Sequence, residues 1–275
     1  MGVWRRNATG ERIPMSNKAK IREESVKMNP IHDVMFSMMA RDPGFCQEIL
    51  RVILNDPLLA LIGDPVVQYH LPNPMGRKVT LDALCKLGDG RIVAIEVQKN
   101  TEPDPQRRVR FESGLLISRL TDPNTPFKDV EDVVFVYISG YDPFDLGKSV
   151  YFIDRIIRGL GNVVYNGFEE VYVNAAVKDG TDVAALMKVF TEDAAYDDRF
   201  PRTSEIKKHF KLTEEGRQEM TAELEKIMVE ERDEGRSEGR IETLIKLVTD
   251  GLLTIAQAAA QLGESEQDFS KRMPA

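Results

Sequence analysis

The stretch VTLDALCKLGDGRIVAIEVQ, residues 79–98, predicts a β-hairpin. Two runs of alternating residues flank Gly88-Asp89-Gly90, and glycine-rich turns between such runs are typical of hairpins. In the first run we expect one face to carry Val79, Leu81, Ala83, Cys85 and Leu87, and the other to carry Thr80, Asp82, Leu84 and Lys86. In the second run Glu96 and Gln98 project to the same face.

The turn determines which residues face each other. If residues 88–90 form a three-residue loop, Asp82 lies directly opposite Glu96. Facing side chains in a sheet have Cβ atoms about 4.5–5.5 Å apart, and like charges at that separation repel. The pair therefore needs a shared proton, a basic partner or a divalent cation. Carboxylate oxygens suit Mg²⁺, which takes one or two protein carboxylates and completes its shell with water and phosphate.

Further side chains near the hairpin fit a phosphodiester-cleaving site. Gln98 could orient an attacking water through hydrogen bonds, although an amide is not a base near neutral pH. Lys78 and Lys86 share the face of Asp82 and are candidates for stabilising phosphate charge. Residues 77–119 carry nine basic and six acidic side chains in a chain of net charge −8. Any contact with nucleic acid is therefore expected from a local patch and not from bulk charge.

The same residues also fit a structural role. Outward-facing Asp, Lys, Glu and Gln are typical of a half-solvated strand pair, and a loop one residue longer or shorter would move Asp82 off Glu96. The arginines within residues 107–110 fit the exposed face of a helix. Asp33 fits a helix N-cap, but it is also an accessory site candidate, because a helix that precedes the hairpin can pack beside it.

Strands and helices alternate outside the hairpin, which favours an α/β fold with a sheet covered by helices. Two helices are expected between Asp33 and Leu54, separated at Asp42-Pro43-Gly44, and a third from Pro105 to about Leu120 with Asp104 as its N-cap. Further strands are expected at residues 66–70, 131–139, 150–156 and 163–173.

Composition excludes several classes of protein. Two cysteines and three histidines are too few and too scattered for a Cys/His zinc site. No stretch approaches the roughly 20 apolar residues of a membrane span, and the first twenty residues lack the apolar segment of a secretory signal. We therefore expect a soluble cytoplasmic protein with no membrane partner.

At the hairpin the sequence resembles the PD-(D/E)XK nucleases, in the version with glutamine at the lysine position. The motif residues are Asp82 and then Glu96-Val97-Gln98. The order of segments is more closely similar to the PD-(D/E)XK nuclease-family transposases, which are related to the Rpn recombination-promoting nucleases of bacteria. The matching segments cover most of residues 28–270 and are Asp33–Phe36, Leu81–Leu84, Ile95–Gln98, Arg107–Phe111, Val134–Ile138, Tyr141–Phe144 and the Glu-Gly-Arg repeats at 234–240.

The resemblance implies a restriction-endonuclease-like α/β fold: a central mixed sheet flanked by helices, with a helical C-terminal extension. Asp82 and Glu96 would bind Mg²⁺, or Mn²⁺, with the Val97 carbonyl as a third ligand. Gln98 would occupy the lysine position. The arginine helix would contact DNA phosphates through Arg107, Arg108 and Arg110. The expected function is Mg²⁺-dependent DNA endonuclease activity in a bacterial transposase or recombination-promoting nuclease family.

Four segments are expected along the chain: a flexible tail at 1–27, the nuclease-like domain at 28–195, a charged helical extension at 196–250 and a small helical segment at 251–275. We expect the Glu-Gly-Arg repeats to form a solvated helix face. The last segment suggests two short helices joined at Gly263-Glu264, either a degenerate helix-turn-helix or, as we prefer, a helical clasp.

A second functional class also fits the sequence. The charged lysine of the motif is missing, the chain is acidic overall, and a long charged helix near the C-terminus could join two copies as a homodimer. These features are typical of a nuclease-like fold kept as a DNA-binding or assembly module without cleavage.

Overall fold

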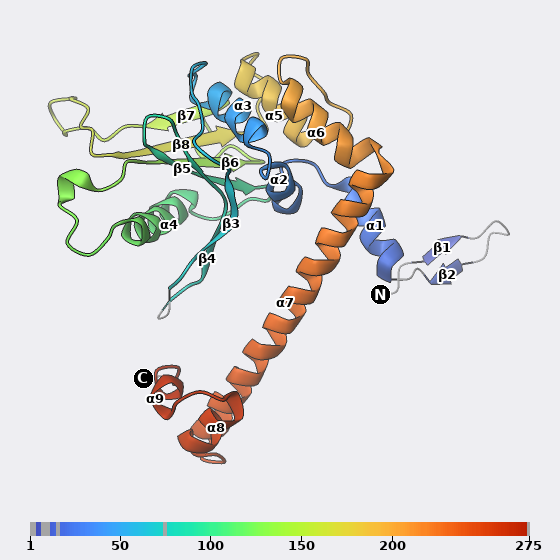
Figure 1. Cartoon of the computed structure of the whole chain (residues 1–275), viewed down its shortest axis with the longest axis vertical. Coiled ribbons are helices and arrows are strands. Elements are labelled where there is room, and N and C mark those ends of the chain that lie inside the picture. The colour runs from blue at the N-terminus through green and yellow to red at the C-terminus, as the bar shows by residue number, and fades with distance from the viewer. Residues whose placement is uncertain (1–3, 7–11, 15–16, 74–75, 274–275) are drawn as a thin grey trace. The chain divides into compact units, whose positions relative to one another are not determined.

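The computed structural model of the chain describes residues 4–6, 12–14, 17–73 and 76–273. Its central feature is a six-stranded sheet in the order β3-β4-β5-β6-β8-β7 (Figure 1). The strands are β3 (Val66–Leu71), β4 (Val79–Lys86), β5 (Ile92–Gln98), β6 (Val133–Ser139), β7 (Val150–Ile153) and β8 (Phe168–Asn174). The pairs β3–β4, β4–β5 and β7–β8 are antiparallel, and β5–β6 and β6–β8 are parallel. The predicted α/β fold with a mixed central sheet is confirmed.

Helices cover both faces of this sheet (Figure 1). One face packs against α2 (Asp33–Met39), α3 (Pro43–Ile53), α5 (Asp182–Thr191) and α6 (Pro201–Leu212), and the other against α4 (Pro105–Leu120). Because side chains alternate along a strand, β5 contributes Val93, Ile95 and Val97 to the first core and Ile92 and Ala94 to the second. The next residues on the α4 side are Glu96 and Gln98, so the two predicted site residues of β5 face α4.

The alternation of β4 breaks at Asp82. The odd-numbered residues of 83–87 lie in the larger core as predicted, but Val79 and Leu81 lie in the α4 core on the opposite face. The prediction of one continuous apolar face is therefore wrong on the N-terminal side of Asp82. In the neighbouring strand β3, Gln68 has a φ of 50°, a conformation uncommon for residues other than glycine. Distorted strand pairs of this kind are frequent beside active sites.

Several predicted boundaries need correction. Asp104 occupies the N-cap position of α4, but it has a φ of 57° and its side chain makes no cap hydrogen bond. Of the predicted strand at 163–173 only β8, from Phe168, belongs to the sheet, because residues 154–166 leave the sheet between β7 and β8. A short 3₁₀ helix, η1 (Phe127–Asp129), precedes β6.

The chain divides into two compact units, residues 1–221 and 222–275. These units differ from the predicted divisions at 195/196 and 250/251, because α6 and the first residues of α7 (Glu214–Thr249) belong to the sheet-containing unit. Within the segment predicted as a flexible tail, β1 (Trp4–Arg6) pairs with β2 (Arg12–Pro14) and α1 (Asn17–Lys27) forms, and the flexibility of the segment stays a prediction. The rest of that predicted tail, residues 1–3, 7–11 and 15–16, lies outside the described residues.

The second unit ends in two short helices joined at Gly263-Glu264, as expected from the sequence, and this arrangement fits both the clasp and the degenerate helix-turn-helix. Helices α8 (Ile255–Leu262) and α9 (Glu266–Ser270) bury Ala258, Ala259 and Phe269 against Leu244 of α7. Gly263 ends α8 with a φ of 70°, which suits glycine at a helix C-terminus. The described side chains of 232–240 are exposed, as expected of a solvated helix face.

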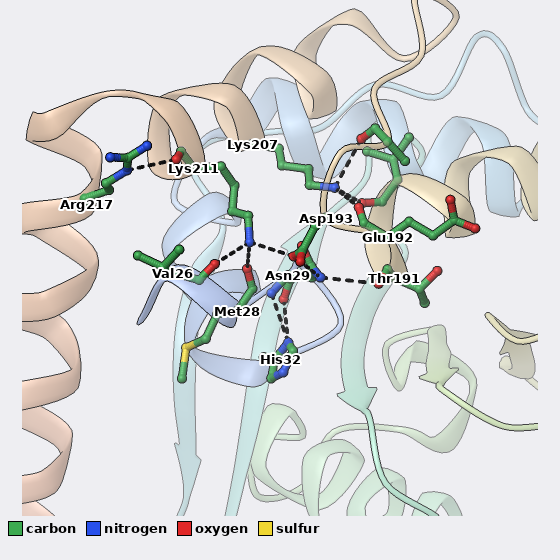
Figure 2. Close-up of polar contacts among 12 residues, drawn as sticks. Val26, Met28, Asn29, His32, Thr191, Glu192, Asp193, Lys207, Lys211 and Arg217 are labelled. Atoms are coloured by element: carbon green, nitrogen blue, oxygen red, sulfur yellow. Dashed lines mark hydrogen bonds and ion pairs between the residues drawn. The ribbon is translucent and has the colours of Figure 1, made fainter. Parts of the chain in front are cut away.

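Two lysines of α6 fix the helices on the larger core (Figure 2). The fully buried ammonium of Lys207 donates to the carbonyl oxygens of Val189, Glu192 and Ala195 at the C-terminal end of α5. Lys211 donates to the Met28 carbonyl and to the Asp193 carboxylate, both at 2.9 Å. Burial lowers the pKa of Lys207 to about 8. Through these contacts α6 holds the chain segment that leads into α2, at the edge of the candidate site.

Replacing Lys207 with methionine is expected to lower the free energy of unfolding by about 2–3 kcal/mol, because buried carbonyl oxygens lose their donor. Lys208→Met is the matched control, since Lys208 is exposed and only approaches the Tyr196 ring, 5.1 Å from its centroid. The control should change stability by less than about 1 kcal/mol. Urea denaturation measures both values, and equal effects would contradict the assigned role of the buried ammonium.

Candidate active site

Strands β4 and β5 pair in the register predicted from the turn. Residues 83–86 lie opposite residues 95–92, in four consecutive pairs. The Leu87 amide donates to the Arg91 carbonyl at 2.9 Å, which closes a three-residue loop, and Gly90 adopts a φ of 101° within it. The predicted loop length is therefore confirmed. The paired residues end at Ala83 and Ile95, and beyond them the Val97 amide donates to the Asp82 carboxylate, which lies close enough to Glu96 for its charge to act on it.

Both carboxylates are buried, with Asp82 7% and Glu96 2% exposed. Asp82 Oδ2 accepts a hydrogen bond from the Val97 amide at 2.8 Å, and Gln68 Nε2 lies 3.4 Å from Asp82 Oδ1. Glu96 Oε2 accepts from Arg108 Nη2 at 3.1 Å. The other oxygen of Glu96, Oε1, is buried without a hydrogen-bond partner among the described residues. A buried carboxylate oxygen without a donor is costly unless a proton or cation neutralises it.

The environment of the pair opposes two full negative charges. Burial raises the pKa of Asp82 to about 7, and the Asp33 charge acts in the same direction, while the Val97 amide and Arg108 oppose the shift. Burial also raises the pKa of Glu96 well above its usual range, with further contributions from the Asp82 and Glu112 charges. Near neutral pH, the pair therefore favours a bound proton or a cation.

The raised pKa of Asp82 predicts a pH dependence of stability in EDTA. The folded state keeps this proton up to about pH 7, whereas an unfolded aspartate loses it near pH 4, so stability falls as pH rises through that window. Asp82→Asn cannot lose a proton and should gain stability relative to the natural protein between pH 5 and pH 7.5. Urea denaturation of both proteins at the two pH values checks this, and a constant difference would contradict it.

Arg108 lies inside the site and not on the DNA-facing surface predicted for it. Its side chain is 26% exposed and reaches from α4 to three partners. Nε contacts Glu112 at 2.9 Å, Nη2 contacts Glu96 at 3.1 Å and Nη1 contacts Gln98 Oε1 at 3.2 Å. A lysine at position 98 would place a second cation against this guanidinium. Glutamine at position 98 instead offers Arg108 a neutral carbonyl oxygen as a hydrogen-bond acceptor.

The structure places Arg107, Arg110 and Lys86 away from the carboxylates. Arg107 and Arg110 are exposed on α4 and line a groove on its other side. Lys86 stands at the turn end of β4, four residues from Asp82, which corresponds to about 13 Å of extended strand. Lys78 is exposed and immediately precedes β4. Lys86 therefore does not reach the carboxylates, and the predicted DNA contacts of Lys78 and Lys86 stay predictions.

Asp33 is brought close to the site, although it is not the N-cap that the sequence suggested. His32 occupies the N-cap position of α2, and Asp33 is the first helical residue, with Oδ1 accepting from the Val34 amide at 2.7 Å. The exposed Asp33 carboxylate contributes to the raised pKa of Asp82. The Val97 carbonyl as a metal ligand stays a prediction, as its amide is the group seen to bind Asp82.

Two residues of the site were missed from the sequence. Glu112 is buried, pairs with Arg108 and keeps Oε2 without a partner among the described residues. Its spacing four residues after Arg108 on a helix was an available signal for an ion pair. Gln68 lies opposite Asp82 in the β3–β4 register, and the connection at residues 72–78 is too long for its turn residues to fix that register from sequence.

Within residues 17–73 and 76–273, no three His, Cys, Asp or Glu side chains are grouped in a way that would hold a metal ion. A two-carboxylate site remains compatible with Mg²⁺, whose other ligands are commonly water and phosphate. None of the described helices combines the length and the apolar character required to span a membrane. Comparison with known proteins found no matching family, no matching curated protein and no matching solved structure.

Proposed function

We propose that this chain is a divalent-metal-dependent DNA endonuclease of the PD-(D/E)XK type, from a bacterial transposase or recombination-promoting nuclease family. The observation that carries the proposal is the Asp82–Glu96 pair: two buried carboxylates on adjacent strands, with raised pKa values and one oxygen without a donor. The donor set fits a hard cation, since both side chains offer only oxygen. Mg²⁺ or Mn²⁺, when bound, would supply Lewis-acid activation of the phosphate and of water.

The other residues of the site have distinct roles in this proposal. Gln98 orients the attacking water through its amide, whose oxygen is itself fixed by Arg108. Arg108 provides a fixed positive charge beside Glu96, the charge that a lysine at position 98 would otherwise supply. Glu112 holds the guanidinium from its own helix, so that its orientation does not depend on the Glu96 contact alone. Arg107 and Arg110 contact the DNA backbone outside the site.

Nicking of supercoiled plasmid tests the proposal directly. Purified protein incubated with Mg²⁺ or Mn²⁺ should convert supercoiled plasmid to the open circular form, and EDTA should prevent it. Absence of nicking with either metal over a range of pH would reject the endonuclease assignment.

The structure also gives one reason to keep the non-cleaving alternative. Arg108 already neutralises one oxygen of Glu96, as a structural ion pair would. In that case the fold serves as a DNA-binding or assembly module, with dimerisation through the C-terminal helices. Titration calorimetry separates the two: a site that takes up no Mg²⁺ or Mn²⁺, with DNA present or absent, favours the module.

A further inference from the structure

An exposed arm extends from the sheet between β7 and β8, visible as the yellow-green loop in Figure 1. We define the arm as residues 154–166. Its two sides pair through the Ile156–Val163 bridge, and the Val164 amide donates to the Arg155 carbonyl at 2.8 Å. The tip turns at Gly159 and Gly161, whose φ values of 87° and 77° suit glycine. The arm is therefore an ordered hairpin, not a loose connection.

The base of the arm is fixed to the sheet. The Tyr165 hydroxyl donates to Asp132 Oδ2 at 2.8 Å, at the start of β6. Gly167 has a φ of 79°, which strains any other residue, and a Cβ there would lie 2.3 Å from Asp132 Oδ1, so a larger residue would displace the Asp132 side chain. The arm consequently keeps a defined position beside α4.

The surface of the arm is unusually apolar for an exposed segment. Every residue of the arm is exposed, including Leu160 at 73% and Ile156 at 60%. The other large exposed apolar residues of the arm are Ile157, Val163, Val164 and Tyr165. Exposed apolar surface on this scale marks a binding face.

Positive charge accompanies these apolar side chains. Arg155 and Arg158 flank Ile156 and Ile157, and neither forms an ion pair with another described residue. A groove of about 550 Å³ separates α4 from the base of the arm, and it is lined by Arg107 and Arg110 on one side and Arg155 on the other. The carboxylate in its lining, Glu170, accepts a hydrogen bond from the Tyr172 hydroxyl. Charge complementarity therefore favours a polyanion with apolar surface between its charges.

We propose that the arm and this groove form a DNA-contacting surface, an inference that rests on the proposed nuclease function. The groove arginines neutralise phosphates of one strand, and the tip residues Ile157 and Leu160 insert against a base step in the minor groove. Apolar side chains used in this way partly unstack DNA and bend it, while adjacent cations hold the backbone. The arm would thus place the strand relative to α4, which also carries Arg108 of the carboxylate site.

Duplex binding measured by fluorescence anisotropy in EDTA tests the surface without cleavage. Arg155→Gln/Arg158→Gln should weaken binding and reduce the slope of log K against log salt by roughly 2, about 0.9 for each lost phosphate contact. Ile157→Ser/Leu160→Ser should weaken binding about tenfold, the loss of roughly 1.4 kcal/mol of apolar contact, with the salt slope unchanged. All four residues are exposed, so folding is not at risk.

Lys188→Gln/Lys208→Gln is the matched control, because both lysines are exposed on helices of the opposite face of the sheet.

A 2-aminopurine duplex adds a direct readout: fluorescence should rise on binding of the natural protein and not of the Ser variant. Variants that bind like the control, or a natural protein that binds no duplex, would overturn the inference. The inference would also be overturned if the natural protein were a dimer and the Ser variant a monomer of unchanged DNA affinity. If the natural protein nicks plasmid and the arm variants bind duplex as tightly as the control, this inference alone is overturned. If DNA binding depends on the arm but the natural protein does not nick plasmid, the result counts against the nuclease.

Discussion

Replacing Glu96 with glutamine is expected to reduce metal-dependent plasmid nicking by at least about a thousandfold, which corresponds to about 4 kcal/mol of lost transition-state stabilisation. Glutamine keeps the size of the side chain, and its carbonyl oxygen can still accept the hydrogen bond from Arg108. It lacks the negative charge that a divalent cation requires. Asp82→Asn should cause a similar loss, because a two-carboxylate site retains little affinity for Mg²⁺ after either charge is removed.

Glu131→Gln is the control for this pair of variants. Glu131 is exposed and precedes β6, so its removal changes the net charge by the same amount without altering the site. Initial nicking rates at saturating Mg²⁺ give the comparison, and titration calorimetry shows whether metal uptake is lost in parallel. Nicking that survives in both Asp82→Asn and Glu96→Gln would exclude these carboxylates as the origin of the activity.

The hairpin, its loop length and the closeness of its two carboxylates could be predicted because the information is local. Strand alternation and a Gly-Asp-Gly turn together fix a register over the few residues that separate Asp82 from Glu96. The helix break at Asp42 was equally local, and Asp42 indeed caps α3 by accepting from the Phe45 amide at 2.9 Å. The break in alternation at Asp82 was not predictable in this way, since it depends on the packing of β4 against α4.

The interior of the site could not be predicted for a related reason. Arg108, Arg107 and Arg110 look equivalent in the sequence, and only the crossing of α4 over β5 decides which of them meets Glu96. The arm shows the converse difficulty. The apolar residues of the arm predicted strands in the sheet. The pairs between β7 and β8 end at Ile153 and Glu170, so the arm extends beyond the sheet and remains exposed.

Arg108→Met is expected to lower the free energy of unfolding by about 3–5 kcal/mol at pH 7.5, the usual result of removing one partner of a buried ion pair. Methionine approximates the length of the arginine side chain but leaves Glu96 and Glu112 without their cation. Arg110→Met is the matched control on the same helix, because Arg110 is exposed and forms no ion pair with another described residue. The control should change stability by less than about 0.5 kcal/mol.

The pH dependence distinguishes lost charge pairing from lost packing in the Arg108→Met protein. Burial raises the pKa of both Glu96 and Glu112, so the folded state binds more protons than the unfolded state above pH 4.5, and stability declines as pH rises. Without the guanidinium this decline steepens, and the deficit should therefore be small at pH 5 and full at pH 7.5. Adding Glu96→Gln and Glu112→Gln to Arg108→Met should recover most of the loss at pH 7.5. A deficit that is independent of pH, and that the triple variant does not reduce, would instead assign Arg108 to packing through its aliphatic stem.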